Sequence, residues 1–248
     1  MTIIEALSPN QDDRGVPVSL CVLHYTGMKT GEEALARMRD PEAQVSAHYM
    51  VEEDGRVFRL VSEDRRAWHA GVAEWRGQTD INARSVGIEI VNPGHEWGYR
   101  SFPEEQIRAV LALVGEITTR HGIGPAGVIG HSDVAPDRKE DPGELFPWDR
   151  LAARGLALPT WREQMPNTET LSQEEATVTL EAIGYAANRF GLAPCLTAFQ
   201  RRFAPKLLGE GLTPGISEAI RWAARLSEEA RIAHRPHDDH DEDQKADP

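Results

Sequence analysis

The chain has 248 residues, and its 40 acidic and 27 basic side chains give it a net charge of −13 at pH 7. This charge argues against nucleic acid as the main partner, because phosphate binding needs a concentrated basic patch. Hydrophobic residues make up 40% of the chain, which is enough to bury a core without disulfides. Cys21 and Cys195 stand far apart, outside any CxxC pair, so the sequence indicates neither a disulfide framework nor a thiolate metal cluster.

No run of apolar residues approaches the roughly 18 to 20 that are needed to cross a bilayer, so we expect no membrane span. The N-terminus has no basic region ahead of an apolar stretch, and it does not resemble a secretory signal. We therefore expect a cytoplasmic protein, with a periplasmic or cell-wall location as the alternative. The oligomeric state stays open.

Strand and helix patterns alternate over residues 1–156. The apolar run Val18–Thr26 predicts a buried strand, and Gly31–Asp40 predicts the helix after it. Two β-rich runs flank an Asp-Gly pair and predict a hairpin. The runs are Ser46–Val51 and Val57–Val61, and the later elements are a strand at Ser85–Asn92, a helix at Pro103–His121, a short strand at Gly127–His131 and a helix at Pro147–Gly155. This alternation is typical of an α/β fold with a mixed central sheet flanked by helices.

The rest of the chain is helical. Residues 157–170 contain two prolines and break the periodicity, which predicts a linker. Residues 171–230 contain three amphipathic stretches and predict a small three-helix bundle, with helices at Leu171–Ala187, Pro194–Phe203 and Ile216–Ala230. We expect this bundle to be a separate unit, because the linker offers little apolar surface. Residues 231–248 are rich in acids and histidines, and we expect a disordered tail.

The residues that suggest chemistry lie at the ends of predicted strands. His24 and His131 each come at such an end, where side chains of an α/β sheet reach the rim at which ligands gather. If the segment Gly130–Trp148 is extended, Lys139 and Asp141 point the same way, toward His131. Two imidazoles and one carboxylate are a standard ligand set for a catalytic zinc ion. A salt-bridged surface loop is the alternative for this segment.

Several segments, taken in order, carry a resemblance to a known family. They are His24-Tyr25-Thr26, Val45-Ser46-Ala47-His48-Tyr49, Trp68-His69-Ala70-Gly71, Ser85-Val86-Gly87-Ile88-Glu89-Ile90 and Gly130-His131-Ser132-Asp133, followed by Lys139, Asp141-Pro142-Gly143 and Pro147-Trp148. Together they resemble the AmpD-like type 2 N-acetylmuramoyl-L-alanine amidases, which are zinc enzymes of the peptidoglycan recognition protein superfamily. The resemblance covers the chain from residue 8 to about residue 155.

The resemblance implies one zinc ion per chain, with His24, His131 and Asp141 as its ligands. It implies that Glu89 is the general base and that Lys139 stabilises the transition state. The sequence agrees for Glu89, which lies in an apolar strand. A carboxylate facing the core there would be costly, so we expect it to face a cleft, with an outward surface glutamate in an alternating strand as the alternative.

The resemblance also places Trp68 and His69 along the substrate groove, with a packed tryptophan and a surface histidine as the alternative. His48 is expected to pack in the interior or to support a ligand. Asp133 is expected to orient His131 or to cap its loop.

The helical part resembles the three-helix peptidoglycan-binding module that is often fused to cell-wall hydrolases. The similarity lies in Cys195–Phe203 with Gly209, Gly211 and Thr213, and it covers roughly residues 171–228. The sequence departs from the module at Glu210-Gly211, where the module has Asp-Gly, and in an insertion at residues 204–208. An inert stabilising bundle is the alternative to glycan binding.

Two functions follow as hypotheses. The first is a zinc amidase that cleaves the amide between the lactyl group of N-acetylmuramic acid, or its anhydro form, and L-alanine in peptidoglycan or muropeptides. The second is a recognition protein that binds muropeptides without cutting them. The presence of Glu89 and Lys139 beside a complete ligand set favours the enzyme. The sequence leaves open whether the substrate is an intact sacculus or a small anhydromuropeptide.

Overall fold

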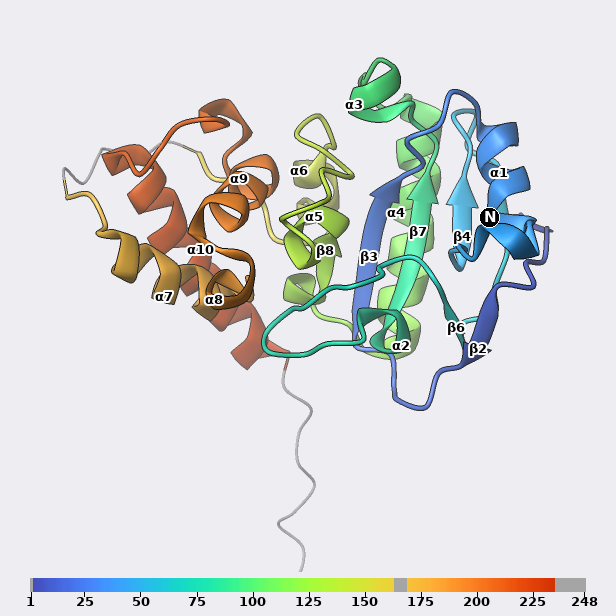
Figure 1. Cartoon of the computed structure of the whole chain (residues 1–248), viewed down its shortest axis with the longest axis horizontal. Helices are drawn as coiled ribbons and strands as arrows, with labels where there is room; N and C mark the ends of the chain where they lie inside the picture. The colour runs from blue at the N-terminus through green and yellow to red at the C-terminus, as the bar shows by residue number, and fades with distance from the viewer. Residues whose placement is uncertain (1, 163–168, 235–248) are drawn as a thin grey trace, which may run out of the picture.

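A six-stranded mixed sheet forms the centre of the protein in a computed structural model, which describes residues 2–162 and 169–234. The strand order is β1-β5-β4-β7-β3-β8, and β4 pairs antiparallel with β5 while the other neighbours are parallel. The strands are β1 (Ile3–Glu5), β3 (Leu20–Tyr25), β4 (Tyr49–Val51), β5 (Val57–Arg59), β7 (Ser85–Ile90) and β8 (Val128–Gly130). A second, antiparallel sheet joins β2 (Gln11–Asp13) to β6 (Arg65–Ala67). The predicted α/β fold with a mixed sheet is confirmed (Figure 1).

The neighbouring strands β3 and β7 each turn one apolar face toward the same helix. Side chains alternate along a strand, and every second residue of β3 and β7 packs against helix α4 (Glu104–His121) in one apolar cluster. That cluster includes Cys21, Leu23, Val86, Ile88 and Ile90. The intervening residues, His24 and Glu89 among them, therefore face away from α4. His24 and Glu89 are also direct partners in the β3–β7 register, so they lie side by side.

Helix α1 (Gly31–Arg39) covers the other end of the sheet. Thr30 caps this helix, because its hydroxyl accepts a hydrogen bond from the Glu33 amide. Ala34 and Met38 pack from α1 onto an apolar cluster that includes Met50 of β4. Every strand and helix predicted for residues 1–156 is present, with its ends shifted by a few residues. The elements that we did not predict there are β1, β2, β6 and the four-residue helices α2 (Ile81–Arg84), α3 (Gly94–Trp97) and α5 (His131–Val134), which are too short to show a period.

Helix α6 (Trp148–Ala152) precedes the C-terminal helices. The three predicted C-terminal helices are confirmed, and a short fourth helix joins them. They are α7 (Gln173–Ile183), α8 (Ala187–Phe190), α9 (Leu192–Phe203) and α10 (Pro214–Ala233). Helix α10 extends past residue 231, where we had placed the start of the tail. The remaining tail, 235–248, and residues 163–168 of the predicted linker lie outside the described residues. Within the described ranges, no helix is both long and apolar enough to cross a membrane.

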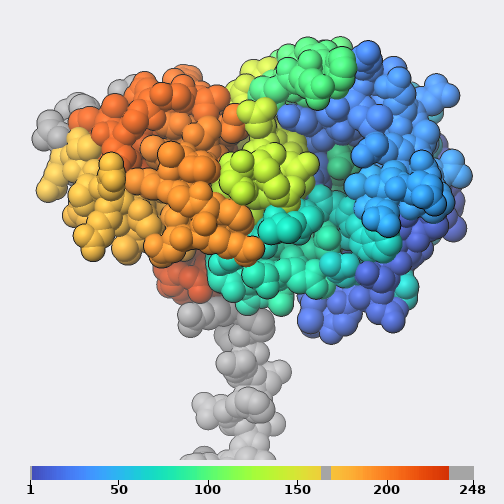
Figure 2. Space-filling model, in the orientation of Figure 1, coloured from blue at the N-terminus to red at the C-terminus, as the bar shows by residue number. Residues whose placement is uncertain are grey.

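The C-terminal helices do not form the separate unit that we expected. Phe199 and Ile220 belong to the same buried cluster as Val22, Trp75 and Val134 from the first part of the chain. Leu158 in the predicted linker is buried in this cluster too. Figure 2 shows the orange C-terminal helices in broad contact with the yellow-green segment around residue 135. An amphipathic pattern shows that a helix buries one face but not what covers it, so the shared core could not be predicted.

Candidate metal and active site

The three predicted metal ligands meet at the carboxyl ends of two adjacent strands. His24 lies near the end of β3, and His131 follows β8 directly as the first residue of α5. His24 Nδ1 lies 2.9 Å from His131 Nδ1, and Asp141 Oδ2 lies 3.0 Å from each of these nitrogens. All three side chains are buried, and their donor atoms lie within 4.8 Å of one another. This spacing allows the three residues to share one metal ion.

Protein groups hold the second nitrogen of each imidazole. His131 Nε2 lies 3.1 Å from the carbonyl oxygen of Ala70, which can only accept a hydrogen bond. Nε2 of His131 therefore carries the proton, and Nδ1 keeps its lone pair for a metal. His24 Nε2 lies 2.9 Å from His69 Nδ1, and His69 Nε2 lies 3.2 Å from Ser85 Oγ. When His24 Nε2 donates to His69 and His69 Nε2 donates to Ser85, the lone pair of His24 Nδ1 stays free for a metal. Such outer partners are typical of metal-binding histidines.

The charge states of the three residues also suit a metal. Burial lowers the pKa of His24 to about 4, so its imidazole is neutral at physiological pH. Burial alone would raise the pKa of Asp141, but His131 and His24 beside it hold that pKa well below its usual range. The site thus offers two imidazole nitrogens and one carboxylate. Donor atoms about 3 Å apart suit the roughly 2.0–2.2 Å ligand distances of zinc, so the residues fit the implied ion.

Glu89 lies beside the ligands with a free carboxylate oxygen. Its Oε2 is buried and has no hydrogen-bond partner among residues 2–162 and 169–234. Burial and the negative charge of Asp141 raise the pKa of Glu89 well above 4.5, while Lys139 opposes this shift. A carboxylate with a raised pKa is a better proton acceptor in catalysis at neutral pH. The expectation that Glu89 faces a cleft is confirmed, because it lines a cavity at the ligands.

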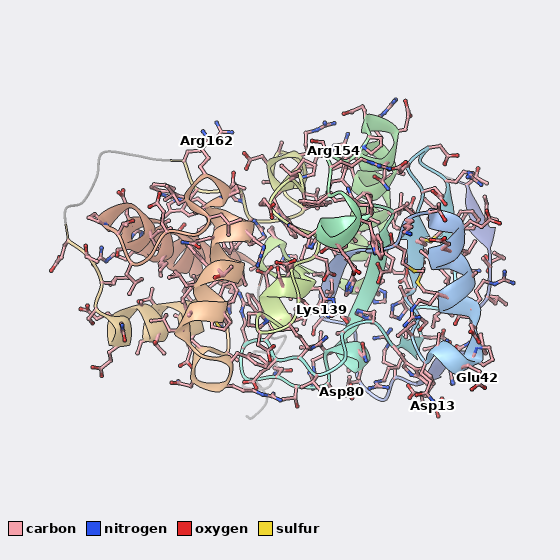
Figure 3. All side chains as sticks on the ribbon, turned by 45° about the horizontal axis from the view of Figure 1, so that its top comes forward. Asp13, Glu42, Asp80, Lys139, Arg154 and Arg162 are labelled. Atoms are coloured by element: carbon pink, nitrogen blue, oxygen red, sulfur yellow. The ribbon has the colours of Figure 1, made fainter. Side chains whose placement is uncertain are left out.

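The cavity has a volume of about 560 Å³. It lies between the yellow-green segment of His131 and Asp141 and the blue residues of α1 (Figure 2). Lys139 lines it from the middle of the molecule, and its side-chain ammonium makes no hydrogen bond or ion pair with a described residue (Figure 3). The other lining residues are Tyr25, Thr26, Gly27, Met28, Ala34, Arg37, Met38, Val45, Ser46, Trp68, His69, Glu89, Arg138 and Glu140.

Trp68 and His69 line this cavity as the resemblance implied, but they differ in what they offer a ligand. The indole Nε1 of Trp68 is buried and has no acceptor among the described residues, so this donor is free. Both ring nitrogens of His69 face protein groups. His69 is therefore placed to orient His24, and this arrangement favours that role over a hydrogen bond to substrate.

The structure also places the two residues whose roles we left open. His48 is fully buried, with Nε2 2.6 Å from Arg14 and with Nδ1 accepting a hydrogen bond from the Gly87 amide. It is a packed residue. Asp133 Oδ2 accepts a hydrogen bond of 2.7 Å from the Gly130 amide, so it caps the loop that carries His131.

Sequence reasoning missed two arginines that add positive charge to the cavity. Arg138 donates hydrogen bonds to the carbonyl groups of Ala70 and Val72, and its place next to Lys139 was the available signal. Arg37 lies on α1 and is exposed, and nothing in its sequence context distinguishes it from a surface residue. With Lys139 they face the carboxylates of Glu89, Glu140 and Asp141, so the cavity presents charges of both signs to a ligand.

The fold and the site together define an α/β protein with a candidate His-His-Asp metal site at a cavity. The family model described as N-acetylmuramoyl-L-alanine amidase (Amidase_2) matches residues 14–144, a range that holds every predicted site residue. The chain belongs to this family.

Comparisons with individual proteins agree with this family assignment. The chain is 39% identical to N-acetylmuramoyl-L-alanine amidase AmiD of Escherichia coli K12 over 151 residues, which are 56% of this chain and 54% of AmiD. It is 34% identical to 1,6-anhydro-N-acetylmuramyl-L-alanine amidase AmpD of Citrobacter freundii over 122 residues, 49% of this chain and 62% of AmpD. The chain thus spans less than two thirds of the length of these curated relatives.

The fold is similar to a solved structure of the E. coli AmiD amidase in complex with anhydro-N-acetylmuramic acid-L-Ala-D-γ-Glu-L-Lys. The TM-score is 0.70 at 29% identity, with 90% of this chain and 91% of that chain covered. Such coverage of this chain includes the C-terminal helices as well as the sheet.

Proposed function

We propose that the protein is a zinc-dependent N-acetylmuramoyl-L-alanine amidase. It hydrolyses the amide between the lactyl group of N-acetylmuramic acid, or its anhydro form, and the L-alanine of the stem peptide. The observation that carries this proposal is that the unpartnered oxygen of Glu89 and the ammonium of Lys139 share one cavity with His131 and Asp141, whose donor atoms lie within 4.8 Å of that of His24. The name of the AmpD relative and the anhydromuropeptide in the AmiD complex point to the same substrate class.

The residues of the cavity divide the chemistry among them. His24, His131 and Asp141 would hold the zinc ion, which when bound polarises a carbonyl group and lowers the pKa of water. Glu89 takes the proton of the attacking water and delivers it to the nitrogen of the leaving amine. Lys139 brings positive charge to the carbonyl oxygen as negative charge builds up on it. The C–N bond breaks, and the products are a lactyl carboxylate and the free amino group of L-alanine.

A recognition protein that only binds muropeptides is the second candidate. Binding requires shape and hydrogen bonds, but it requires no proton acceptor with a raised pKa. The position of Glu89 beside the ligands therefore favours cleavage over simple recognition.

Four sequence predictions remain proposals. They are the division of the chain into a catalytic part at 1–156, a connection at 157–170 and helices at 171–230 that share its core, contact of Trp68 and His69 with substrate, glycan binding by the helices, and a cytoplasmic location. Cell fractionation tests the last of these, and sacculus pull-down tests the third.

Metal content tests the ligand set. The purified protein should carry close to one zinc ion per chain by elemental analysis, and a chelator should abolish release of the stem peptide from an anhydromuropeptide. His131→Ala should lose both zinc and activity, because two ligands hold the ion far less tightly than three. Full activity of a zinc-free preparation would refute the mechanism.

Glu89→Gln separates the base from the ligands. The amide keeps the shape but cannot accept a proton, so zinc content should persist while kcat falls by a factor on the order of 10² to 10⁴. Glu116→Gln, on the exposed side of α4, is the matched control and should behave as wild type. Normal kcat in Glu89→Gln would assign the base to another residue, and loss of zinc would make Glu89 a ligand.

A further inference from the structure

One buried carboxylate links the metal-ligand segment to the C-terminal helices. Asp133 is only 1% exposed. Its Oδ2 accepts the hydrogen bond from the amide of Gly130, the residue before His131. Its Oδ1 accepts a hydrogen bond of 2.6 Å from the hydroxyl of Tyr185, which lies in the turn between α7 and α8. The start of α5 is therefore bonded, through a single side chain, to the C-terminal helices.

The ring of Tyr185 is fixed on both sides. Tyr185 is 1% exposed. Its ring packs edge to face with the rings of Trp75 and Phe199, at centroid distances of 5.1 Å and 6.3 Å. Gly184 allows this close packing, since a Cβ at that position would lie only 2.5 Å from the Trp75 ring. The hydroxyl of Tyr185 is thus held at a defined place by the shared core.

Helix α9 supplies two further contacts. Arg201 forms an ion pair of 2.5 Å with Glu140, which lies between Lys139 and Asp141 in the sequence. The guanidinium of the buried Arg202 stacks 3.8 Å above the ring of Trp148. Burial raises the pKa of Asp133, and the positive charge of Arg202 opposes this shift. Both arginines therefore stabilise acidic side chains of the metal-ligand segment.

The segment from Gly130 to Asp141 is tied together by its own backbone. The Ser132 amide donates to the carbonyl oxygen of Asp141 over 2.9 Å, and the Lys139 amide donates to that of Ala135 over 3.0 Å. Helix α5 has only four residues, too few to be stable without tertiary packing. A displacement of α5 would thus move the ligands His131 and Asp141 together.

We propose that Tyr185 is a positioning residue for the metal site, and that the C-terminal helices hold His131 and Asp141 in place through the Tyr185–Asp133 hydrogen bond and the Arg201–Glu140 ion pair. The inference rests on the proposed function, because it takes these two residues as zinc ligands. It gives the C-terminal helices a role in the metal site that is independent of any glycan binding.

The test compares two tyrosines that make the same kind of bond. Tyr185→Phe removes the hydroxyl and leaves the packed ring. Tyr49→Phe is the matched control, since the buried Tyr49 also donates a 2.6 Å hydrogen bond to a carboxylate, that of Glu63, but packs in the cluster of α4. Both full-length variants are checked for folding by near-ultraviolet circular dichroism. Zinc affinity is then measured by competition with a chromophoric chelator, and the visible spectrum of the cobalt-substituted protein reports the ligand geometry.

We expect Tyr185→Phe to weaken zinc binding by about 10-fold and to change the cobalt spectrum, as for loss of an outer partner of a metal ligand. Tyr49→Phe should leave both unchanged. Normal affinity and a normal spectrum in Tyr185→Phe would overturn the proposal. Equal weakening in both variants would overturn it too, because it would then reflect a general loss of stability. Failure of the wild-type protein to bind zinc would instead refute the proposed function.

Arg201→Gln is a second test of the proposal if Tyr185→Phe cannot be purified in folded form. It removes the ion pairs with Glu140 and Glu144 and leaves the apolar residues of the shared core unchanged. Weaker zinc binding than in the exposed control Arg225→Gln would support the proposal, and equal affinity in these two variants would contradict it.

Discussion

Phe199→Ala tests whether the two parts of the chain unfold together. Phe199 is fully buried in α9, its ring stacks on that of Phe203 at 5.3 Å, and it belongs to the cluster that also holds Val22 of β3. Truncating such a phenylalanine removes its burial and leaves a cavity, at a cost of about 3–5 kcal/mol. That is a large part of the roughly 5–15 kcal/mol that keeps a domain folded.

The expected signal follows from the shared core. For a chain of this size, about 1 kcal/mol shifts Tm by about 2–4 °C, so Phe199→Ala should lower Tm by roughly 6–20 °C. Calorimetry on the chelator-treated protein should show one transition, which moves as a whole. Hydrogen exchange should accelerate in β3 as well as in α9, because the cluster spans both.

Leu113→Ala is the matched control for this experiment. Leu113 is 1% exposed in α4, on the opposite face of the sheet, and its truncation should lower the same single transition. Two transitions, of which Phe199→Ala lowers one and Leu113→Ala the other, would refute the shared core. So would unchanged exchange of the β3 amides in Phe199→Ala.

Two further substitutions test other contacts. Gly87→Ala should weaken zinc binding by about 10-fold in a chelator competition. The added Cβ would lie 2.5 Å from the ring of His69 and push that ring away from His24. Unchanged zinc affinity would show that His69 does not orient His24. Glu63→Gln should lower the free energy of unfolding by about 1–3 kcal/mol at about pH 7, measured with urea. Burial alone would raise the pKa of Glu63, but hydrogen bonds from Arg120 and Tyr49 hold this pKa below 4.5. The ionised Glu63 therefore stabilises the fold above pH 4.5, and this stabilisation is lost as the pH falls through the folded pKa. The difference between Glu63→Gln and wild type should shrink at about pH 3.5, and a constant difference would contradict this assignment.

The sequence was sufficient to predict the sheet, because the apolar run Val18–Thr26 and the β-branched residues of Ser85–Asn92 are local signals. It also predicted that Glu89 faces a cleft, since burial of a carboxylate in an apolar strand is costly. The direct pairing of Glu89 with His24 depends on the register between β7 and β3. That register is fixed by packing between distant parts of the chain, so no local pattern shows it.

The contacts that surround the site were harder to predict for the same reason. The family resemblance placed His69 along the substrate groove, but its ring nitrogens meet groups from β3 and β7. Tyr185 follows a helix-ending glycine and has the local context of a turn residue. Only the packing of the C-terminal helices on α5 brings it to Asp133.

This packing changes what the C-terminal helices can be expected to do. A module that only tethers an enzyme to a polymer needs a flexible connection and few contacts, and its loss affects the local concentration of substrate alone. Here the helices share a core with β3, and they bond to side chains next to two metal ligands. Their removal would expose apolar surface of the sheet and free the Asp133 carboxylate.

Chain termination near residue 162 should therefore reduce zinc binding and turnover of a small anhydromuropeptide, and not only turnover of intact sacculi. Normal turnover of the small substrate by the shortened chain would restore the view of the helices as a tether.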